Sequence, residues 1–394
     1  MMDAAKNIFK HHQAQTFPYP SCLEVESARG SYIIDINGKE YLDFVAGVSA
    51  CTLGHSNPII TNAVKNQLDK HTHVMVYGEY IQSPQYQLAK LLAENLPKKL
   101  STTYFTNSGT EAIEGAMKLA KRATGRSEIV FCKNSYHGST QGALSIMGDE
   151  EHKSAFRPLL PNCNEIIYND IKSLKIITKK TAAVVIEPVQ GASGFITPKN
   201  NFLQKVAEKC KQSETLLILD EVQTCYGRLG KLFGFEKYNI TPDILCIAKG
   251  MGAGMPIGAF IASWKLMNLL TFKPKLGHIT TFGGHPVNCA ASLACLKYLM
   301  NSDIMNEVAK KELLFRKHLA HPKVKSIRGK GLMLAIEFEN EVLVKKIVER
   351  SLKKGLILFY FLFTKTAIRI TPPLTISAEE IIDGCNKIKE VLKE

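Results

Sequence analysis

The chain has 394 residues, enough for two or three domains with their own hydrophobic cores, which excludes a small disulfide-stapled scaffold. Hydrophobic residues make up 45% and charged residues 22%, and the mean hydropathy of -0.04 excludes a disordered chain. The longest apolar run, Leu356 to Phe363, is too short to cross a bilayer and is typical of one buried strand.

The net charge of +14 raises the question of an anionic partner. Only nine of the 50 basic residues are arginine, the lysines are spread along the chain, and no basic block is interleaved with aromatics. We therefore expect neither a nucleic-acid nor a membrane partner. The ten cysteines form no CxxC pair and no secretory leader is recognisable, so we expect a cytoplasmic protein. The histidines show no ligand spacing, and we expect no metal.

The first 54 residues are expected to form a small β element after an irregular stretch. Residues 1–30 show no regular pattern. Segments 31–36 and 39–44 flank Asn37-Gly38, which is the sequence signal of a type I′ hairpin. We expect this segment, residues 1–54, to pack on the smaller domain.

From residue 55 onward, helical stretches alternate with short apolar strands. The strands are expected at residues 103–105, 129–132, 183–186, 216–219 and 244–248. Such alternation is the signature of a mostly parallel sheet with helices on both faces. We expect a large α/β domain over residues 55–299. Apolar strands and a closing amphipathic helix after Thr375 predict a smaller α+β domain over residues 300–394.

The residues that follow each predicted strand are unusually polar, and in open α/β sheets ligands bind at this edge. Ser108, Gly109 and Thr110 follow the first strand and begin a stretch of helical spacing that continues to Ala123. Free N–H groups and hydroxyls at a helix start can bind a phosphate. A simple helix cap is the alternative for these residues taken alone.

The next three strands end in an aromatic, an imidazole and carboxylates. Tyr136 and His137 follow the second strand, Glu187 ends the third, and Asp220-Glu221 ends the fourth. A structural tyrosine and histidine remain an alternative here. Two carboxylates at neighbouring strand ends suggest a metal site or an acid and base pair, but the residues that accompany the two carboxylates differ.

The fifth strand delivers Lys249 into a glycine-rich turn. Burial disfavours the charge of a lysine and thereby prepares it as a nucleophile. Glycines 250, 252 and 254 superficially match a dinucleotide loop, but Pro256 stands where the helix of that motif should begin. A phosphate site, an aromatic, a buried acid and a strand-end lysine are together what pyridoxal phosphate requires.

These residues make the chain resemble the class III aminotransferases of fold type I, which use pyridoxal phosphate. The likeness covers nearly the whole chain. It rests on the motifs Gly38-Lys-Glu-Tyr-Leu-Asp-Phe, Leu53-Gly-His, Ser108-Gly-Thr-Glu-Ala, Tyr136-His-Gly, Glu187-Pro-Val-Gln-Gly, Leu219-Asp-Glu-Val-Gln, Ala248-Lys-Gly, Thr280-Thr-Phe-Gly-Gly and Arg369-Ile-Thr-Pro-Pro-Leu.

The resemblance implies a role for each of these positions. Lys249 is expected to hold the cofactor as a Schiff base and to move the proton between the substrate Cα and the cofactor C4′. Asp220 is expected to hold the pyridinium proton. The remaining cofactor contacts implied by the resemblance are Ser108, Gly109, Thr110, Tyr136, His137, Glu187, Gln223 and, from a neighbouring subunit, Thr281. The active unit is therefore expected to be a homodimer with shared sites.

Substrate recognition is expected to involve Arg369, Thr280 and the position of Ser139. The arginine matching Arg369 grips a substrate carboxylate in this family. Acetylornithine, ornithine and 4-aminobutyrate enzymes carry an arginine where this chain has Ser139, and several carry a glutamate where it has Ala192. A substrate that needs a second carboxylate grip is therefore expected to find it at other residues.

The resemblance implies ping-pong transfer of an amino group from an amino acid or ω-amino compound to a 2-oxo acid, such as 2-oxoglutarate or pyruvate. Acetylornithine and ornithine aminotransferases are the expected relatives. An aminomutase, racemase or decarboxylase reaction on the same fold is an alternative, because Lys249 and Asp220 alone do not select the bond that breaks. A non-catalytic dimeric paralogue is another.

Overall fold

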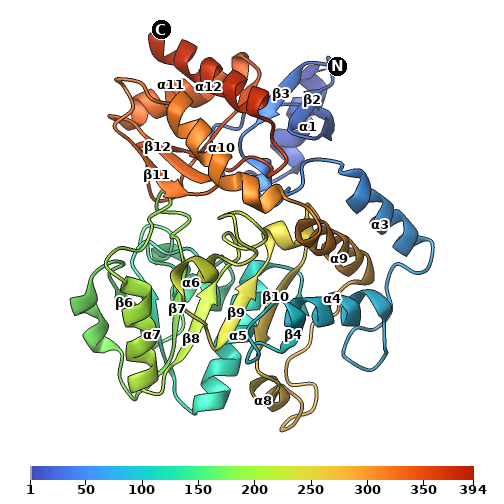
Figure 1. The fold of residues 1–394 in the computed structure, drawn as a ribbon, viewed down its shortest axis with the longest axis vertical. Helices are drawn as coiled ribbons and strands as arrows, with labels where there is room; N and C mark the ends of the chain where they lie inside the picture. The colour runs from blue at the N-terminus through green and yellow to red at the C-terminus, as the bar shows by residue number, and fades with distance from the viewer. Residues whose placement is uncertain (1) are drawn as a thin grey trace.

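A computed structural model describes residues 2–394 and shows a large lower layer of sheet and helices beneath a smaller α+β region (Figure 1). The lower region contains a seven-stranded sheet in the order β4-β10-β9-β8-β7-β5-β6. Its strands are β4 (Thr102–Thr106), β5 (Glu128–Cys132), β6 (Cys163–Ile166), β7 (Thr181–Ile186), β8 (Leu216–Asp220), β9 (Ile244–Ile247) and β10 (Gly258–Ala262). All five strands expected in this domain are present, and the sequence analysis missed β6 and β10.

Strand direction places the candidate site at one edge of this sheet. Strands β6, β5, β7, β8 and β9 pair in parallel, whereas β10 pairs antiparallel with both β9 and β4. Strand β4 therefore runs in the same direction as β9. The carboxyl ends of β4, β5, β7, β8 and β9 lie along one edge, as the sequence analysis expected.

Helices cover both faces of the sheet (Figure 1). They are α3 (Pro58–Leu68), α4 (Ser83–Glu94), α5 (Gly109–Thr124), α6 (Gln141–Ser145), α7 (Phe202–Gln212), α8 (Trp264–Met267) and α9 (Pro286–Met300). One apolar core lies between α5 and the sheet and includes Ile113, Phe131 and Phe260, while a larger core covers the other face. All six residues of β7 are buried, as a strand covered on both faces requires.

Two four-stranded sheets form the smaller region. The first contains β1 (Val25–Arg29), β2 (Tyr32–Asp35), β3 (Glu40–Asp43) and β13 (Leu356–Ile357), and the second contains β11 (Ser326–Lys330), β12 (Met333–Glu337), β15 (Ala367–Ile370) and β14 (Phe359–Tyr360). Helices α10 (Ile304–His318), α11 (Glu341–Lys353) and α12 (Ala378–Lys393) accompany them. Because β13 pairs with β3, chain from both ends of the sequence shares one sheet. The boundaries at residues 54 and 299 remain a prediction.

The closing helix forms as expected and begins at a capping box. The Glu380 N–H donates to Ser377 Oγ at 3.1 Å, and the Ser377 N–H donates to Glu380 Oε2 at 2.8 Å. The reciprocal bonds satisfy two amides at the start of α12.

Three local expectations were wrong. The stretch 1–30 is not irregular, because it contains α1 (Met2–His12) and β1. The hairpin forms, but its turn is not type I′: Gly38 has φ +79°, whereas Asn37 is not among the positive-φ residues. Instead, Asp35 Oδ1 accepts the N–H groups of Asn37 and Lys39 at 2.9 and 3.0 Å. The apolar run 356–363 is not one strand, because its two halves join different sheets as β13 and β14.

Within residues 2–394, no helix combines the length and the apolar character needed to cross a bilayer.

Candidate active site

Lys249 lies two residues beyond β9, at the start of a 3-10 turn, and is partly exposed. Its backbone is left-handed with φ 45°, a conformation that costs a non-glycine residue about 1 to 3 kcal/mol. Burial lowers the pKa of Lys249; the negative charge of Asp220 opposes this shift and the positive charge of Arg369 adds to it. The sheet therefore holds Lys249 in a strained position that favours its neutral, nucleophilic form.

The turn between β4 and α5 forms the expected helix start. Ser108 is the N-cap of α5, and its Oγ accepts the Glu111 N–H at 3.3 Å. A Cβ on Gly109 would lie 2.8 Å from both methyl carbons of Val222, in the loop after β8. Only glycine allows this close approach, which brings the α5 amino terminus against the end of β8.

A second glycine packs the loop after β5 onto the same turn. Gly138 has φ +134°, and a Cβ there would lie 2.1 Å from Thr110 Oγ1. Thr110 Oγ1 in turn lies 2.7 Å from Thr140 Oγ1. Residues 108–110 and 138–140 therefore form one cradle of hydroxyls at the amino terminus of α5, which suits an anion.

His137 and Asp220 form the buried centre of the site. His137 Nδ1 lies 2.7 Å from Asp220 Oδ2, and Asp220 Oδ1 accepts the Val222 N–H at 2.9 Å. Burial opposes the charge of His137, but the hydrogen bond and charge of Asp220 outweigh it and raise the His137 pKa. His137 Nε2 is buried without a partner among the described residues.

Glu187 supports the backbone around this centre. Its two carboxylate oxygens accept the Tyr136 N–H at 3.3 Å and the Gly191 N–H at 2.7 Å. Burial raises the pKa of Glu187 to about 7, and the positive charge of His137 limits the shift. Glu187 and Asp220, the two carboxylates at neighbouring strand ends, have different hydrogen-bond partners.

Glu221 points away from the site into the protein. It accepts the Gly234 N–H at 2.6 Å and the Thr224 hydroxyl at 2.9 Å. Burial raises the pKa of Glu221 to about 7, and these hydrogen bonds oppose the shift. Its role is to hold the loop that follows β8.

Gln223 meets a residue that the sequence analysis did not single out. Its Nε2 donates to Ser49 Oγ at 3.1 Å, and a Cβ on Gly191 would lie 2.4 Å from its Oε1. Ser49 belongs to the short α2 turn (Ala46–Ser49), which has left-handed backbone angles. A single serine in a loop carries no sequence signal of this contact.

Arg369 lies on β15 and is only 7% exposed. Its Nε donates to the Tyr360 carbonyl at 3.0 Å, and its guanidinium carbon lies 4.9 Å from the centre of the Phe361 ring. Burial lowers the pKa of Arg369 to about 10. No ion pair to Arg369 occurs within residues 2–394, so its remaining donors are available to an anion.

The remaining predicted positions lie at the rim. Ser139 is exposed, and its Oγ lies 3.2 Å from the Tyr136 hydroxyl. Thr280 Oγ1 accepts a hydrogen bond from Asn107 Nδ2 at 3.0 Å, next to the α5 turn. Thr281 is exposed and makes no hydrogen bond to the cradle of its own chain, as far as the described residues show.

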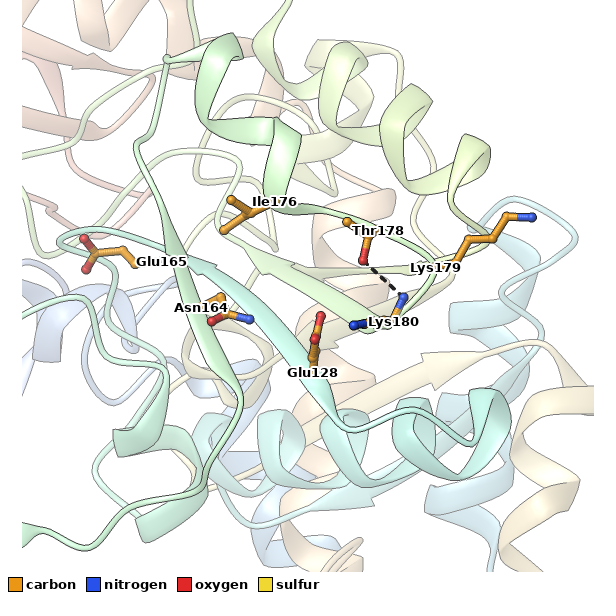
Figure 2. Close-up of a pocket in the computed structure, with 7 residues that line it drawn as sticks. All are labelled: Glu128, Asn164, Glu165, Ile176, Thr178, Lys179 and Lys180. Atoms are coloured by element: carbon orange, nitrogen blue, oxygen red, sulfur yellow. Dashed lines mark hydrogen bonds between the residues drawn. The ribbon is translucent and has the colours of Figure 1, made fainter.

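A cavity of about 740 Å³ lies elsewhere, beside the amino ends of β5 and β7 (Figure 2). Glu128 and Lys180 come from these strand starts, and the Lys180 N–H donates to Thr178 Oγ1 at 3.2 Å. This is the sheet edge opposite Lys249, and no predicted site residue lines the cavity. In the described part of the chain, no group of three or more His, Cys, Asp or Glu side chains could hold a metal.

Comparison with known proteins decides the family. Residues 14–392 match the family described as Aminotransferase class-III. The chain belongs to the class III aminotransferases. An acetylornithine aminotransferase from Methanopyrus kandleri is 36% identical over 100% of this chain and 99% of its own length.

Solved structures of aminotransferases share the whole fold. The ornithine aminotransferase of Toxoplasma gondii ME49 superposes with a TM-score of 0.92 at 28% identity, covering 100% of this chain and 95% of its own. The adenosylmethionine-8-amino-7-oxononanoate aminotransferase of Methanocaldococcus jannaschii superposes with a TM-score of 0.91 at 29% identity, covering 100% and 99%. The predicted fold type I architecture is confirmed.

As a class III aminotransferase, the enzyme uses pyridoxal phosphate to transfer an amino group from an amino donor to a 2-oxo acid. The comparisons do not favour the aminomutase, racemase, decarboxylase or non-catalytic alternatives. The residues present fit the cofactor. A Cβ has no space at Gly109 or Gly138, the two glycines of the cradle. The strand ends also bring Lys249 together with the buried His137 and Asp220.

Proposed function

We propose that the strand-end residues hold pyridoxal phosphate in the way the resemblance implies. Ser108, Gly109 and Thr110 would bind the phosphate, Tyr136 would stack on the ring, Gln223 would bond the phenolic oxygen, and Lys249 would hold the aldehyde carbon covalently. Asp220 would retain the proton of the pyridine nitrogen, with His137 and Glu187 supporting it. The support for this assignment is that the fold gathers these side chains at one sheet edge.

When bound, the cofactor supplies a ring that withdraws electrons from the substrate Cα. The lowered pKa of Lys249 favours an amine that accepts the Cα proton and returns it. Asp220, which lies 2.7 Å from His137 Nδ1, would present its carboxylate to the ring nitrogen. The two residues therefore divide the work between proton transfer and charge stabilisation.

We propose that the donors are monocarboxylates or ω-amines, with 2-oxoglutarate or pyruvate as acceptor, and that Arg369 grips the carboxylate of each substrate that has one. The observation that carries this proposal is the burial of Arg369. Burial is the sole cause of the lowering of its pKa to about 10, and the charge of Arg369 lowers the pKa of Lys249. Ala192 lies next to this region, since its carbonyl accepts the Phe363 N–H at 3.1 Å. It has no carboxylate with which to neutralise Arg369.

Steady-state kinetics test this choice. We expect 4-aminobutyrate and a simple ω-amine to compete well with N-acetylornithine and ornithine as donors, with each 2-oxo acid tested as acceptor. Ala192→Glu should raise the KM of monocarboxylate substrates about tenfold, because a charged hydrogen bond is worth about 1.5 to 3 kcal/mol. Ala192→Gln is the neutral control. A clear preference for N-acetylornithine with 2-oxoglutarate, undiminished in Arg369→Ala, would contradict the proposal.

We further propose a homodimer in which Thr281 reaches the phosphate bound by the other subunit. Two neighbouring loops expose large apolar side chains: Tyr80 is 60% and Ile81 92% exposed in one, and Phe282 is 53% exposed in the other. The loops touch, since the rings of Phe282 and His73 lie 4.9 Å apart. A second copy covering this surface would remove apolar area from water.

Complementation between inactive variants tests the shared site. Lys249→Ala and Thr281→Ala proteins are mixed under conditions that exchange subunits. If Thr281 serves the neighbouring subunit, each mixed dimer regains one complete site and activity rises above that of either variant. If Thr281 serves its own subunit, mixing restores nothing, and sedimentation shows separately whether dimers form.

A further inference from the structure

Arg228 is a fully buried cation that the proposed mechanism does not use. It lies in the loop after β8, eight positions beyond Asp220, and is 1% exposed. Its Nη1 donates to the carbonyls of Leu332 at 3.3 Å and Pro372 at 2.5 Å, while Nη2 has no partner among the described residues. Burial lowers the pKa of Arg228 to about 10, and no carboxylate counteracts the shift. An apolar side chain of similar volume would fill this position with a smaller desolvation penalty than Arg228.

Both carbonyls lie just beyond the ends of two paired strands: Leu332 directly precedes β12, and Pro372 follows β15, the strand that carries Arg369. Strands β12 and β15 pair with Ala335 opposite Arg369 and Leu334 opposite Ile370. Continuing this register brings Leu332 opposite Pro372. Because proline has no N–H, Pro372 cannot donate a backbone hydrogen bond to the strand opposite. Arg228 Nη1 bonds both carbonyls instead and joins the strand ends.

The backbone of Arg228 makes the same connection. Its carbonyl accepts the Leu332 N–H at 3.0 Å. Gly331 has φ +60°, and a Cβ there would lie 2.5 Å from the Arg228 carbonyl oxygen. The chain before β12 therefore lies directly against Arg228, and only glycine permits the approach.

The other side of this loop packs on the turn of Lys249. Cys225 Sγ donates to the Ala248 carbonyl at 3.7 Å, and a Cβ on Gly250 would contact Tyr226 Cβ at 3.5 Å. One short loop thus contacts the residues on both sides of Lys249 and the strand of Arg369. Lys249 and Arg369 are in turn close enough for the charge of Arg369 to lower the Lys249 pKa.

We propose that Arg228 is a positioning residue that sets the distance between the amine of Lys249 and the carboxylate-binding guanidinium of Arg369. This inference rests on the proposed role of Arg369. If Arg228 has this role, it affects substrate selection. Replacing Arg228 would loosen β15 and displace the guanidinium of Arg369, while the strand-end residues around the cofactor stay in place. Binding of the substrate carboxylate should then weaken while the chemistry at the amino group continues.

The test uses the holoenzyme and a pair of acceptors that differ only in the carboxylate. For pyruvate the partner is acetaldehyde, and for 2-oxoglutarate it is succinic semialdehyde; the faster 2-oxo acid is chosen. Arg228→Lys keeps the charge but has a shorter reach, which draws its single nitrogen back from both carbonyls. We expect the KM of the 2-oxo acid to rise about tenfold, with kcat and the aldehyde KM within about twofold. Propanoate binding, measured by calorimetry, should weaken by a similar factor.

Arg316→Lys is the matched control. Arg316 also donates to two carbonyls of the same sheet, those of Ile327 at 2.6 Å and Gly329 at 2.9 Å. These lie on β11, which β12 separates from β15. The control should leave the KM ratio of the two acceptors unchanged.

Arg369→Ala tests the carboxylate grip separately from the role of Arg228. If this variant changes the KM of the 2-oxo acid and of the aldehyde equally, the proposed carboxylate grip is wrong. If Arg369→Ala raises the KM of the 2-oxo acid alone, but Arg228→Lys affects both acceptors equally or not at all, the carboxylate grip is supported and the proposed role of Arg228 is wrong. Loss of the thermal unfolding transition in Arg228→Lys would also overturn it, because Arg228 would then be a purely structural residue.

Discussion

His137 and Asp220, separated by 83 positions in the chain, lie with Nδ1 and Oδ2 2.7 Å apart beneath the polar edge of the sheet. The hydrogen bond and charge of Asp220 outweigh burial and raise the His137 pKa. The two side chains are both buried, and the raised pKa favours the protonated form of His137 beside the Asp220 carboxyl group. Each partner stabilises the charge of the other.

The first prediction concerns this carboxylate. Asp220→Asn keeps the shape but removes the charge, so we expect the rate of Cα proton exchange to fall by at least about 100-fold at full cofactor occupancy. Exchange of deuterium into the donor, followed by NMR, measures this rate. Asp243→Asn is the control, since Asp243 Oδ2 accepts the Leu217 N–H at 2.9 Å at the opposite end of β8. Near-native exchange in Asp220→Asn would refute the assignment.

The second prediction assigns the covalent attachment to Lys249. We expect Lys249→Ala to abolish turnover and to leave the cofactor removable by dialysis. Borohydride treatment and peptide mapping of the wild type should find the adduct on Lys249. Lys237 is the control, because burial and neighbouring lysines also lower its pKa, yet it lies outside the strand-end site. A cofactor adduct on any other lysine would refute this prediction.

The third prediction concerns the close approach at Gly109. Gly109→Ala places a methyl group 2.8 Å from both Val222 methyl carbons, so the cradle must open. We expect cofactor affinity to fall about tenfold or more, measured by fluorescence titration of the apoenzyme. Val222→Ala removes both methyls and should restore affinity in the double variant. Gly138→Ala should not be rescued by Thr110→Ser, because serine keeps the hydroxyl oxygen and the Cβ that the added methyl would meet at 2.1 and 2.4 Å, and because φ +134° strains any side chain at position 138.

A failure of Val222→Ala to restore binding would show that Gly109 matters for another reason than this contact.

The fourth prediction concerns pH and the pair of His55 and Asp43, whose Nε2 and Oδ2 atoms lie 2.9 Å apart. Hydrogen bonds to Asp43 and Cys51 raise the His55 pKa to about 10 against burial. Because the folded pKa is raised, the pair stabilises the protein fully below about pH 6.5, the unfolded value. This contribution is lost as pH rises toward 10.

Urea unfolding of His55→Gln should therefore show a loss of about 1 to 3 kcal/mol relative to wild type at pH 6, shrinking toward pH 10. His11→Gln is the control, since His11 is exposed near the end of α1. A difference between His55→Gln and wild type that stays constant from pH 6 to pH 10 would contradict the linkage.

The sequence by itself determined five of the seven strands of the large sheet and the residues at their carboxyl ends, but it missed β6 and β10. Apolar strands and the helix after Ser108 follow from local patterns, because burial and capping act on neighbours in the chain. A lysine placed directly after a buried strand likewise carries its own signal. The polar edge strand β6, the hairpin turn held by Asp35 and the splitting of the run 356–363 were missed, because sheet membership depends on distant partners.

Tertiary structure alone decided how the strand ends act on one another. Gln223 reaches Ser49 across 174 positions, and Arg228 reaches Pro372 across 144. No periodicity or motif encodes such contacts, because each depends on how two separately patterned segments pack. The lowered pKa values of Lys249 and Arg369 have the same origin: they arise from burial and, at Lys249, from the charge of Arg369, which only the packed fold brings near.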